Sequence, residues 1–475
     1  MLRSAFAVCL ALLLAVAPPT QAQVAPETLG QGETPTNVIL LIPDGYGPAS
    51  VTMARDYLRW RDGTTELAYD SLHIGSIRTF SSSSRITDSA AGGTALATGK
   101  KTYNGAISVD TSEQAVATLL EGAERSGMAT GLVATSRITH ATPAVFSAHV
   151  PDRGQENRIA RQQLNQDIEV MLGGGRRHFL PQSAEGSARD GNRNLLSTAR
   201  DRGYTVVESA DELTQAGDGP LLGLFSDSHM AYELNRKGTN QPSLDTMTEA
   251  AINRLSTEED GYFLMVEGSR IDHAGHGNDA ASHLHDILAF NEAVKTALDA
   301  AKDDENTLVL VVSDHETGGL TLGRNRDGEG IYAWHPNVLS NVTASSGVIA
   351  DSIRTIRSSD ADEDVKERQI AGTLTHFTGV SDIADDTIDK LMEVDGPYRV
   401  GRTVSTVVNR KALVGWTSHA HTAVDVGLYG YGPGAYRFIG NQDNTEIART
   451  LSNLLGADLR TLTSEIQSDR AATGR

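Results

Sequence analysis

Cysteine and lysine are both scarce in this chain of 475 residues, and aromatic side chains make up only 5% of it. The one cysteine is Cys9, so no disulfide can form within the rest of the chain, which must be stabilised by its core, by metal ions or by association. Lysine supplies only 8 of the 41 basic residues, against 61 acidic ones, for a net charge of −20. This balance excludes the basic footprint of a nucleic-acid-binding protein, and the 39% hydrophobic content excludes a disordered chain.

Long apolar runs are also missing, apart from a short one near the N-terminus. Residues 5–17 are apolar, follow Arg3, and are too few to span a bilayer, while Thr20-Gln21-Ala22 offers small residues for cleavage. We therefore predict a signal peptide over residues 1–22 and an exported mature chain, 23–475, in the periplasm or outside the cell. A buried N-terminal helix is the weaker alternative. No later segment resembles a membrane anchor, and the last residues, 471–475, are mostly polar.

Short apolar runs alternate with amphipathic segments along most of the chain. The runs lie at 37–42, 130–135, 168–172, 262–266 and 307–312, and the amphipathic segments at 114–126, 244–255 and 281–300. Strands that are apolar on both faces are typical of a parallel sheet covered by helices on both sides. We predict an α/β fold around a central, mostly parallel sheet. Residues 323–406 break the rhythm, are polar and include the acidic segment 360–364, so we interpret them as an insertion.

Three of the apolar runs end in side chains that can bind metals. The run at 37–42 leads to Asp44, the run at 262–266 to Glu267, and the run at 307–312 to Asp314 and His315. Ligand sites in open α/β sheets lie beyond the carboxyl ends of the strands, so these groups should meet there. Unpaired carboxylates would repel one another, which makes divalent cations their natural partners.

Spacing suggests which ions these groups would bind. Asp272 and His276 are four residues apart and share one face of a helix, an arrangement that suits zinc, although many such pairs are simply solvated. An oxygen set such as Asp44, Glu267 and a hydroxyl better suits magnesium. His419 and His421, two residues apart, are further candidate metal ligands. The alternative is that they lie in a solvated loop and bind nothing.

A serine nucleophile is suggested by the segment Asp88-Ser89-Ala90-Ala91-Gly92-Gly93-Thr94-Ala95. Its small side chains allow a close approach where a helix begins, and a helix N-terminus favours both phosphate and a serine alkoxide. An ordinary helix cap is the simpler interpretation of this segment taken alone. Arg153 carries the planar fork that binds two phosphate oxygens, but it could equally be a surface ion-pair partner.

Together these segments resemble the alkaline phosphatase family, whose motifs occur here in the family's order between about residues 37 and 433. The resemblance rests on Pro43-Asp44-Gly45, the Ser89 segment, His140-Ala141-Thr142, Val266-Glu267-Gly268, Ile271-Asp272-His273 with His276, Asp314-His315 and His421. It implies the family's α/β fold and a metal-dependent phosphomonoesterase with a serine nucleophile. The insertion at about 323–406 would then correspond to the crown or large loop that contacts the partner subunit in dimers.

The resemblance also implies a role for each matching residue. Ser89 would be the nucleophile, and Arg153 would bind the substrate phosphate. Asp272, His276 and His421 would bind a first zinc ion; Asp44, Asp314 and His315 a second; and Asp44, Thr142 and Glu267 a magnesium ion. His421 is preferred to His419 because the family's histidine lies five residues before the first apolar position of the next strand, here Val426.

His140 and His273 depart from the enterobacterial pattern, which has aspartate and lysine there, and resemble the animal and marine-bacterial one. They are expected to tune the magnesium site indirectly, while direct binding of a third zinc stays open. The expected partners are small phosphate monoesters, inorganic phosphate and a second copy of the chain. A phosphodiesterase or another hydrolase of the same metal-dependent superfamily is the alternative function. A sulfatase is disfavoured because Ser89 lacks the Cys/Ser-x-Pro-x-Arg context.

Overall fold

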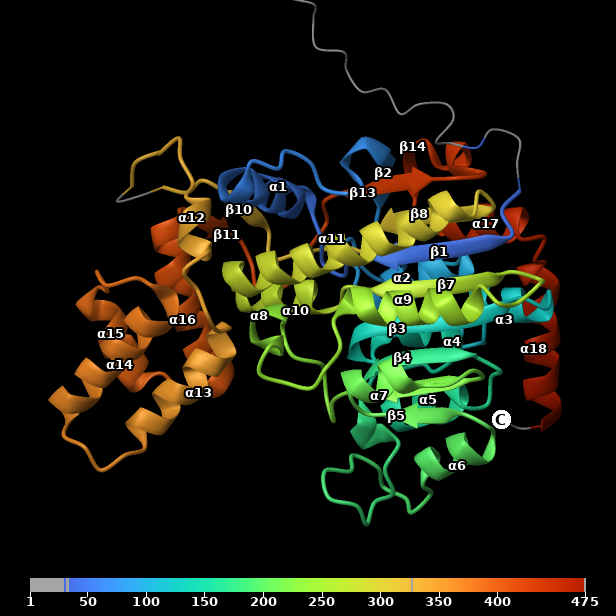
Figure 1. The fold of residues 1–475 in the computed structure, drawn as a ribbon, viewed down its shortest axis with the longest axis horizontal. Helices are drawn as coiled ribbons and strands as arrows, with labels where there is room; N and C mark the ends of the chain where they lie inside the picture. Colours follow the sequence, from blue (N-terminus) through green and yellow to red (C-terminus); the bar gives the residue numbers. More distant parts are fainter. Residues whose placement is uncertain (1–29, 31–33, 326–327, 474–475) are drawn as a thin grey trace, which may run out of the picture.

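The computed structural model describes residue 30, residues 34–325 and residues 328–473. The predicted signal peptide, residues 1–22, lies outside this range. A large twisted sheet with helices on both faces forms the body of the molecule, and a helical lobe projects from one end of it (Figure 1). The predicted α/β class is confirmed.

Ten strands form the main sheet in the part of the chain that the structure describes. Their order is β14-β2-β13-β8-β1-β7-β3-β4-β6-β5, and neighbours run parallel except where β13 pairs with β2 and β8. The strands of this sheet are β1 (Asn37–Ile42), β2 (His73–Arg78), β3 (Ala129–Arg137), β4 (Val170–Gly174), β5 (Thr205–Val207), β6 (Leu221–Leu224), β7 (Tyr262–Glu267), β8 (Thr307–Val312), β13 (Val426–Tyr431) and β14 (Gly440–Asp443). Two small antiparallel pairs complete the strands: β9 (Glu316–Thr317) with β12 (His421–Thr422), and β10 (Leu320–Leu322) with β11 (Val414–Trp416).

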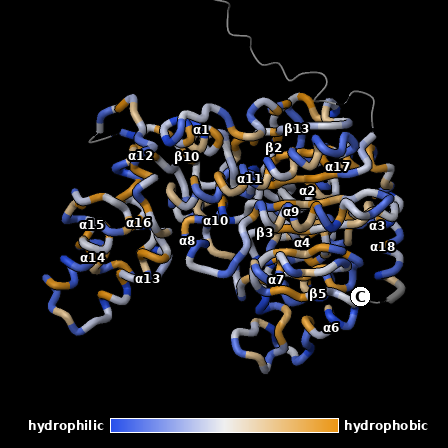
Figure 2. Tube along the Cα trace, viewed as in Figure 1, coloured by the Kyte–Doolittle hydropathy of each residue, from blue (hydrophilic) through white to orange (hydrophobic). Residues whose placement is uncertain are grey.

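The central strands are apolar on both faces, as the sequence predicted. Val38, Leu40 and Ile42 of β1 face one buried cluster, whereas Ile39 and Leu41 face another on the opposite side. Each cluster is closed by helices, and Figure 2 shows the hydrophobic segments gathered along the strands. Burial on both faces explains why these runs lack the alternation of a half-exposed strand.

Helices cover both faces of this sheet. One face is covered by α2 (Ser89–Thr98), α3 (Leu119–Arg125), α4 (Ala141–Ser147), α5 (Glu156–Gln163), α6 (Leu195–Asp201) and α17 (Thr445–Leu454). The other is covered by α1 (Pro48–Asp62), α7 (Ala210–Gln215), α9 (Leu244–Leu255), α10 (Arg270–Gly277) and α11 (Ala280–Asp303). The short helix α8 (Glu233–Arg236) lies beside α11, and the C-terminal helix α18 (Leu459–Thr473) lies beside α3. Within the described residues, three short turns of 3₁₀ helix lie at Asp70–Leu72, Arg176–His178 and Ala435–Phe438.

One predicted helix is much shorter than expected. The amphipathic segment 114–126 becomes helical only at Leu119, because Thr118 and Glu121 form a reciprocal cap in which each side chain accepts the other's backbone N–H. Just before it, Ala115 pairs with Val109 in an extended bridge. The helix starts where its cap is, and the apolar pattern alone does not reveal that point.

The residues between β10 and β11 form the lobe and add no strand to the main sheet within the described ranges. Its helices are α12 (Pro336–Leu339), α13 (Ser346–Arg357), α14 (Glu363–Thr378), α15 (Asp385–Glu393) and α16 (Pro397–Ala412). Ile353, Leu374, Leu391 and Val404, one from each of the last four helices, meet in a small core of their own. The lobe therefore has apolar packing separate from that of the sheet.

Candidate active site and metal centre

The site lies at the carboxyl ends of three adjacent strands, β8, β1 and β7. Glu267 is the last residue of β7 and pairs in register with Ile42 of β1, whereas Asp44 and Asp314 lie just beyond β1 and β8. All three carboxylates are fully buried. Gly45 is essential here because its φ is +76° and a Cβ atom would lie 2.7 Å from the Asp272 Cα.

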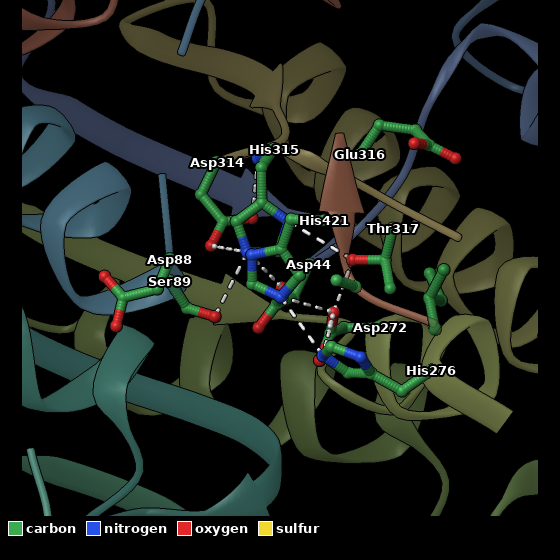
Figure 3. A network of polar contacts seen from close by, with 12 residues as sticks. Asp44, Asp88, Ser89, Asp272, His276, Asp314, His315, Glu316, Thr317 and His421 are labelled. Atoms are coloured by element: carbon green, nitrogen blue, oxygen red, sulfur yellow. Dashed lines mark hydrogen bonds and ion pairs between the residues drawn. The ribbon is translucent and has the colours of Figure 1, made fainter. Parts of the chain in front are cut away.

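Four side chains converge on one point beside β8. The Nε2 atom of His315 lies 3.1 Å from Ser89 Oγ, 3.4 Å from Asp44 Oδ1 and 3.3 Å from Asp314 Oδ2 (Figure 3). Ligands of a tetrahedral zinc ion bound at about 2.0 Å are separated by roughly 3.3 Å. This spacing matches the predicted second ion site, with the candidate nucleophile directed at it.

Ser89 owes its position to the start of α2. Asp88 caps this helix through Oδ1, which accepts the Ala91 N–H at 2.9 Å, and Ser89 is the first helical residue. Gly92 allows the helix to approach closely, because a Cβ atom there would lie 3.0 Å from the Asp314 carbonyl oxygen. The cap and the nucleophile interpretations of this segment therefore describe the same geometry.

A second group of ligands lies at the more exposed side of the site. Asp272 Oδ1 is 3.4 Å from Nε2 of both His276 and His421, and these two nitrogens are 3.1 Å apart (Figure 3). Asp272 and His276 lie one turn apart on α10, as the spacing predicted, and His421 comes from β12. The separations again suit tetrahedral zinc.

The other nitrogens of these two rings are fixed by carbonyl groups. His276 Nδ1 lies 2.7 Å from the His419 carbonyl oxygen, and His421 Nδ1 lies 2.9 Å from that of Thr87. A carbonyl can only accept, so each Nδ1 carries a hydrogen, and each Nε2 faces Asp272 and can hold either a proton or a metal ion. His419 thus contacts the site through its backbone, and the structure brings His421, rather than His419, together with the other ligands.

The predicted oxygen set also comes together. Thr142 Oγ1 lies 3.4 Å from Asp44 Oδ2, and Asp44, His140 and Glu267 each direct a potential ligand atom to within 4.8 Å of the others. Asp44 therefore faces two positions, one through each carboxylate oxygen. Thr142 is a buried residue of α4, which follows β3.

Charge is unevenly balanced across the site. Burial raises the pKa of Asp44 well above its ordinary range, that of Asp314 to about 7 and that of Glu267 to about 8. Burial would also raise the pKa of Asp272, but its hydrogen bond with His421 and the charge of His276 hold that pKa well below normal. For the first three carboxylates, burial outweighs the groups that would lower their pKa, so they are costly to ionise.

Unsatisfied oxygen atoms show that metal ions fit this site. Asp44 Oδ1, Asp314 Oδ2 and Glu267 Oε1 are buried and have no hydrogen-bond partner among the described residues. Buried polar atoms almost always have partners, and carboxylates without them are typical of ion-binding positions. The donor atoms, their spacing and these orphaned oxygens together suit divalent cations.

Arg153 lies beside the nucleophile rather than on an unrelated surface. One guanidinium nitrogen donates to Asp88 Oδ2 at 3.0 Å, and the other lies 3.1 Å from His140 Nε2. The side chain is 28% exposed, so it can still reach a ligand. The structure shows Arg153 in an ion pair with Asp88, the residue that caps the Ser89 helix, and phosphate binding by Arg153 stays a prediction.

Two further contributors were missed by sequence reasoning. Thr317 donates to Asp272 Oδ1 at 2.5 Å, and His229 from the loop after β6 packs against His140 and His273. The short strand β6 was not predicted, so nothing marked His229 as lying at a strand end. Thr317 follows the Asp314-His315-Glu316 segment, and that position is the signal that could have revealed it.

Comparisons with known proteins agree with this geometry. Residues 35–457 match the family model described as alkaline phosphatase. The repressible alkaline phosphatase of Saccharomyces cerevisiae is 38% identical, over 91% of this chain and 84% of its own length. Alkaline phosphatase 3 of Bacillus subtilis is 36% identical, over 89% and 90%. The crystal structure of Thermus thermophilus alkaline phosphatase superposes with a TM-score of 0.79 and 30% identity, covering 96% of this chain and 100% of that one.

The fold and the site define a metal-dependent hydrolase of the phosphoric monoester class. The chain belongs to the alkaline phosphatase family. None of the helices in the described ranges is long and apolar enough to cross a membrane.

Proposed function

We propose that the chain hydrolyses phosphate monoesters to an alcohol and inorganic phosphate through a covalent phosphoserine at Ser89, with two zinc ions and one magnesium ion as cofactors. The observation that carries this proposal is the convergence of Ser89 Oγ, His315 Nε2, Asp44 Oδ1 and Asp314 Oδ2. Asp44, Asp314 and His315 would hold one zinc; Asp272, His276 and His421 the other; and Asp44, Thr142 and Glu267 the magnesium. An alkaline phosphatase variant from the Antarctic bacterium TAB5, 29% identical to this chain and with one histidine replaced by aspartate, is described with Mg in its M3 site, so a third, magnesium-binding site exists in a relative.

Ser89 is placed for in-line attack on a phosphate held at the start of α2. Its hydroxyl oxygen would form a bond to phosphorus as the bond to the leaving alcohol breaks, and water would later release phosphate from the serine. Bound divalent cations lower the pKa of the attacking hydroxyl and offset the charge of the leaving oxygen. The free N–H groups at the helix start favour the negative phosphate oxygens.

Arg153 is the residue that would grip the substrate. Its two terminal nitrogens point along the Asp88 and His140 side of the site, and a guanidinium can donate to two phosphate oxygens at once. The leaving-group side is open, since the His276 side chain is 30% exposed. We therefore propose broad specificity for the alcohol portion.

Turnover of p-nitrophenyl phosphate and its bis ester, at alkaline pH, tests this function. Monoester hydrolysis should vanish after chelation and return only when zinc and magnesium are both restored. Preference for the bis ester would instead support a phosphodiesterase. No turnover by the metal-loaded protein would overturn the proposal.

We also propose that the chain is exported, that residues 323–406 are an insertion in one catalytic domain, and that the lobe contacts a second subunit. The sequence of residues 1–22 and the separate apolar core of the lobe support these proposals. N-terminal sequencing of the mature protein tests export. Light scattering of the wild type and of a variant with charged residues on the exposed lobe surface tests the dimer.

A further inference from the structure

Three imidazoles from three separate segments meet beside the oxygen set. His140 precedes α4, His229 lies in the loop between β6 and α8, and His273 lies on α10. The ring centroids are 4.3 Å apart for His229 and His273, 5.2 Å for His140 and His229, and 5.4 Å for His140 and His273. One nitrogen from each ring lies within 4.8 Å of the other two. Only His140 also belongs to the group with Asp44 and Glu267.

Ordinary packing does not account for this cluster. The Nδ1 atom of His140 is buried without a hydrogen-bond partner in the described part of the chain. Because Arg153 donates to Nε2 of this ring, the Nδ1 atom carries the ring hydrogen and lacks the acceptor that a buried N–H group normally has. The three rings also face one another edge to face, which directs polar ring edges into a shared space.

The surrounding guanidinium groups show that these imidazoles present lone pairs. Arg153 lies 3.1 Å from His140 Nε2, Arg270 lies 2.7 Å from His273 Nδ1, and Arg137 contacts His229 Nε2. A guanidinium can only donate, so each contacted nitrogen accepts and the rings are neutral. Cations therefore already occupy the lone pairs that a metal ion would take.

Each guanidinium has a second partner, with which it stays in contact if a metal ion displaces it from the imidazole ring. Arg137 forms an ion pair with Glu156 at 2.6 Å, Arg153 forms one with Asp88 at 3.0 Å, and Arg270 lies 3.8 Å above the ring of Tyr232. The carboxylates also balance the local positive charge. A divalent ion can thus replace the guanidinium contacts without leaving an arginine unpaired.

We propose that His140, His229 and His273 form a binding site for one divalent metal ion of the zinc type, distinct from the oxygen set of Asp44, Thr142 and Glu267. Three imidazoles without a carboxylate select zinc, cobalt, nickel or copper over magnesium. Zinc–nitrogen bonds of about 2.0–2.1 Å separate tetrahedral ligands by roughly 3.4 Å, so nitrogens that lie within 4.8 Å of one another need to approach by at most about 1.4 Å. The inference rests on the proposed function only in assigning Asp44, Thr142 and Glu267 to magnesium.

Metal content of His229→Gln tests the site, because His229 belongs to no other proposed ion position. Chelated full-length wild type, His229→Gln and the control His376→Gln, which alters an exposed residue of α14, are titrated with zinc at saturating magnesium. The wild type and the control should bind one more equivalent of zinc than His229→Gln, or bind it at least about 100-fold more tightly. Equal stoichiometry and affinity in all three proteins would overturn the proposal.

Anomalous diffraction from zinc-loaded wild-type crystals tests the site without a variant. A peak within bonding distance of the three imidazoles supports it, and no peak there at zinc saturation overturns it. Hydrolysis of p-nitrophenyl phosphate by the same samples separates the two proposals. Turnover without a His229-dependent ion contradicts only the imidazole site, and a His229-dependent ion without turnover contradicts only the proposed function.

Discussion

Asp44, Asp314 and Glu267 form a buried group of candidate metal ligands, whereas Asp272, His276 and His421 form a rim group of candidate ligands only a few ångströms away. The buried carboxylates are fully enclosed, have raised pKa values and carry oxygens without partners among the described residues. In the rim group, Asp272 has a lowered pKa because His421 and His276 face it, and carbonyl groups fix both rings. The rim group compensates its own charge, and the buried group depends on added cations. Metal ions should therefore affect the stability of the folded protein mainly through the buried group.

The largest expected effect comes from Ser89→Ala, which removes the hydroxyl that faces the buried group. We expect kcat to fall by at least about 10⁴-fold, because the proposed covalent intermediate forms on the hydroxyl that this substitution removes. Metal content should be unchanged, since the carboxylate and imidazole ligands remain. Steady-state kinetics and metal analysis check this, with the exposed loop variant Ser82→Ala as control. Substantial residual activity would show that the nucleophile assignment is wrong.

Removal of the metal ions should make the free energy of unfolding depend on pH, because the buried carboxylates then lose their cations. In the metal-free protein Asp314 and Glu267 stay protonated up to about pH 7 and 8, whereas their ordinary pKa values are 3.8 and 4.5. The native state then holds more protons than the unfolded state, so the free energy of unfolding falls as pH rises toward 8. Buried histidines with lowered pKa values, such as His315, oppose this only below about pH 6.5.

Thermal unfolding between about pH 6.5 and 8 measures this effect. The gap in Tm between metal-loaded and chelated protein should widen by on the order of 5 °C across that window. Glu267→Gln removes one of the two titrations, so its chelated form should show a shallower slope. A gap that stays constant or narrows would mean that the buried carboxylates are ionised without metal.

Arg153→Ala tests the accessible edge of the site, where this residue is proposed to bind the substrate phosphate without binding a metal ion. Loss of a two-pronged charged hydrogen bond costs about 1.5–3 kcal/mol, so affinity for inorganic phosphate should fall by roughly 10- to 150-fold. Arg153→Lys keeps the positive charge but loses the two-pronged guanidinium, so its affinity for phosphate should lie between those of the wild type and Arg153→Ala. Inhibition constants for phosphate measure both variants. An unchanged constant for Arg153→Ala would remove the residue from substrate binding.

The smallest effect should come from the lobe, which contacts the rim group through the backbone. The Tyr398 hydroxyl donates to the His276 carbonyl oxygen at 3.0 Å, and Arg402 approaches the same oxygen at 3.5 Å. Tyr398→Phe removes about 0.5–1.5 kcal/mol of hydrogen bonding, so zinc should bind the rim group roughly 2- to 10-fold more weakly. Tyr332→Phe, at a fully exposed tyrosine, is the matched control. Competition with a chromogenic chelator measures the zinc affinity of each variant. Equal zinc affinities for Tyr398→Phe and Tyr332→Phe would show that the lobe does not position His276.

Local sequence features were enough to place most of the strands that carry ligands. The runs ending at Asp44, Glu267 and Asp314 needed no further information, because strands buried on both faces are apolar throughout. The edge strands β5 and β14 and the inner strand β6 were missed because they are short and their neighbours supply part of their stabilisation. Without β6, nothing in the sequence linked His229 to His140, 89 positions earlier.

Composition, strand ends and ordered motifs determined the class of fold, the ligand types and the position of Ser89, because each depends on neighbours along the chain. Tertiary structure alone decided which oxygen of Asp44 faces which group, that Asp88 joins Arg153 to the nucleophile, and that His419 contributes a carbonyl rather than an imidazole. These outcomes depend on distances of about 3 Å between segments far apart in sequence. Such distances are fixed only when strands, caps and helices pack together, which is why the charge balance of the site emerges from the folded molecule.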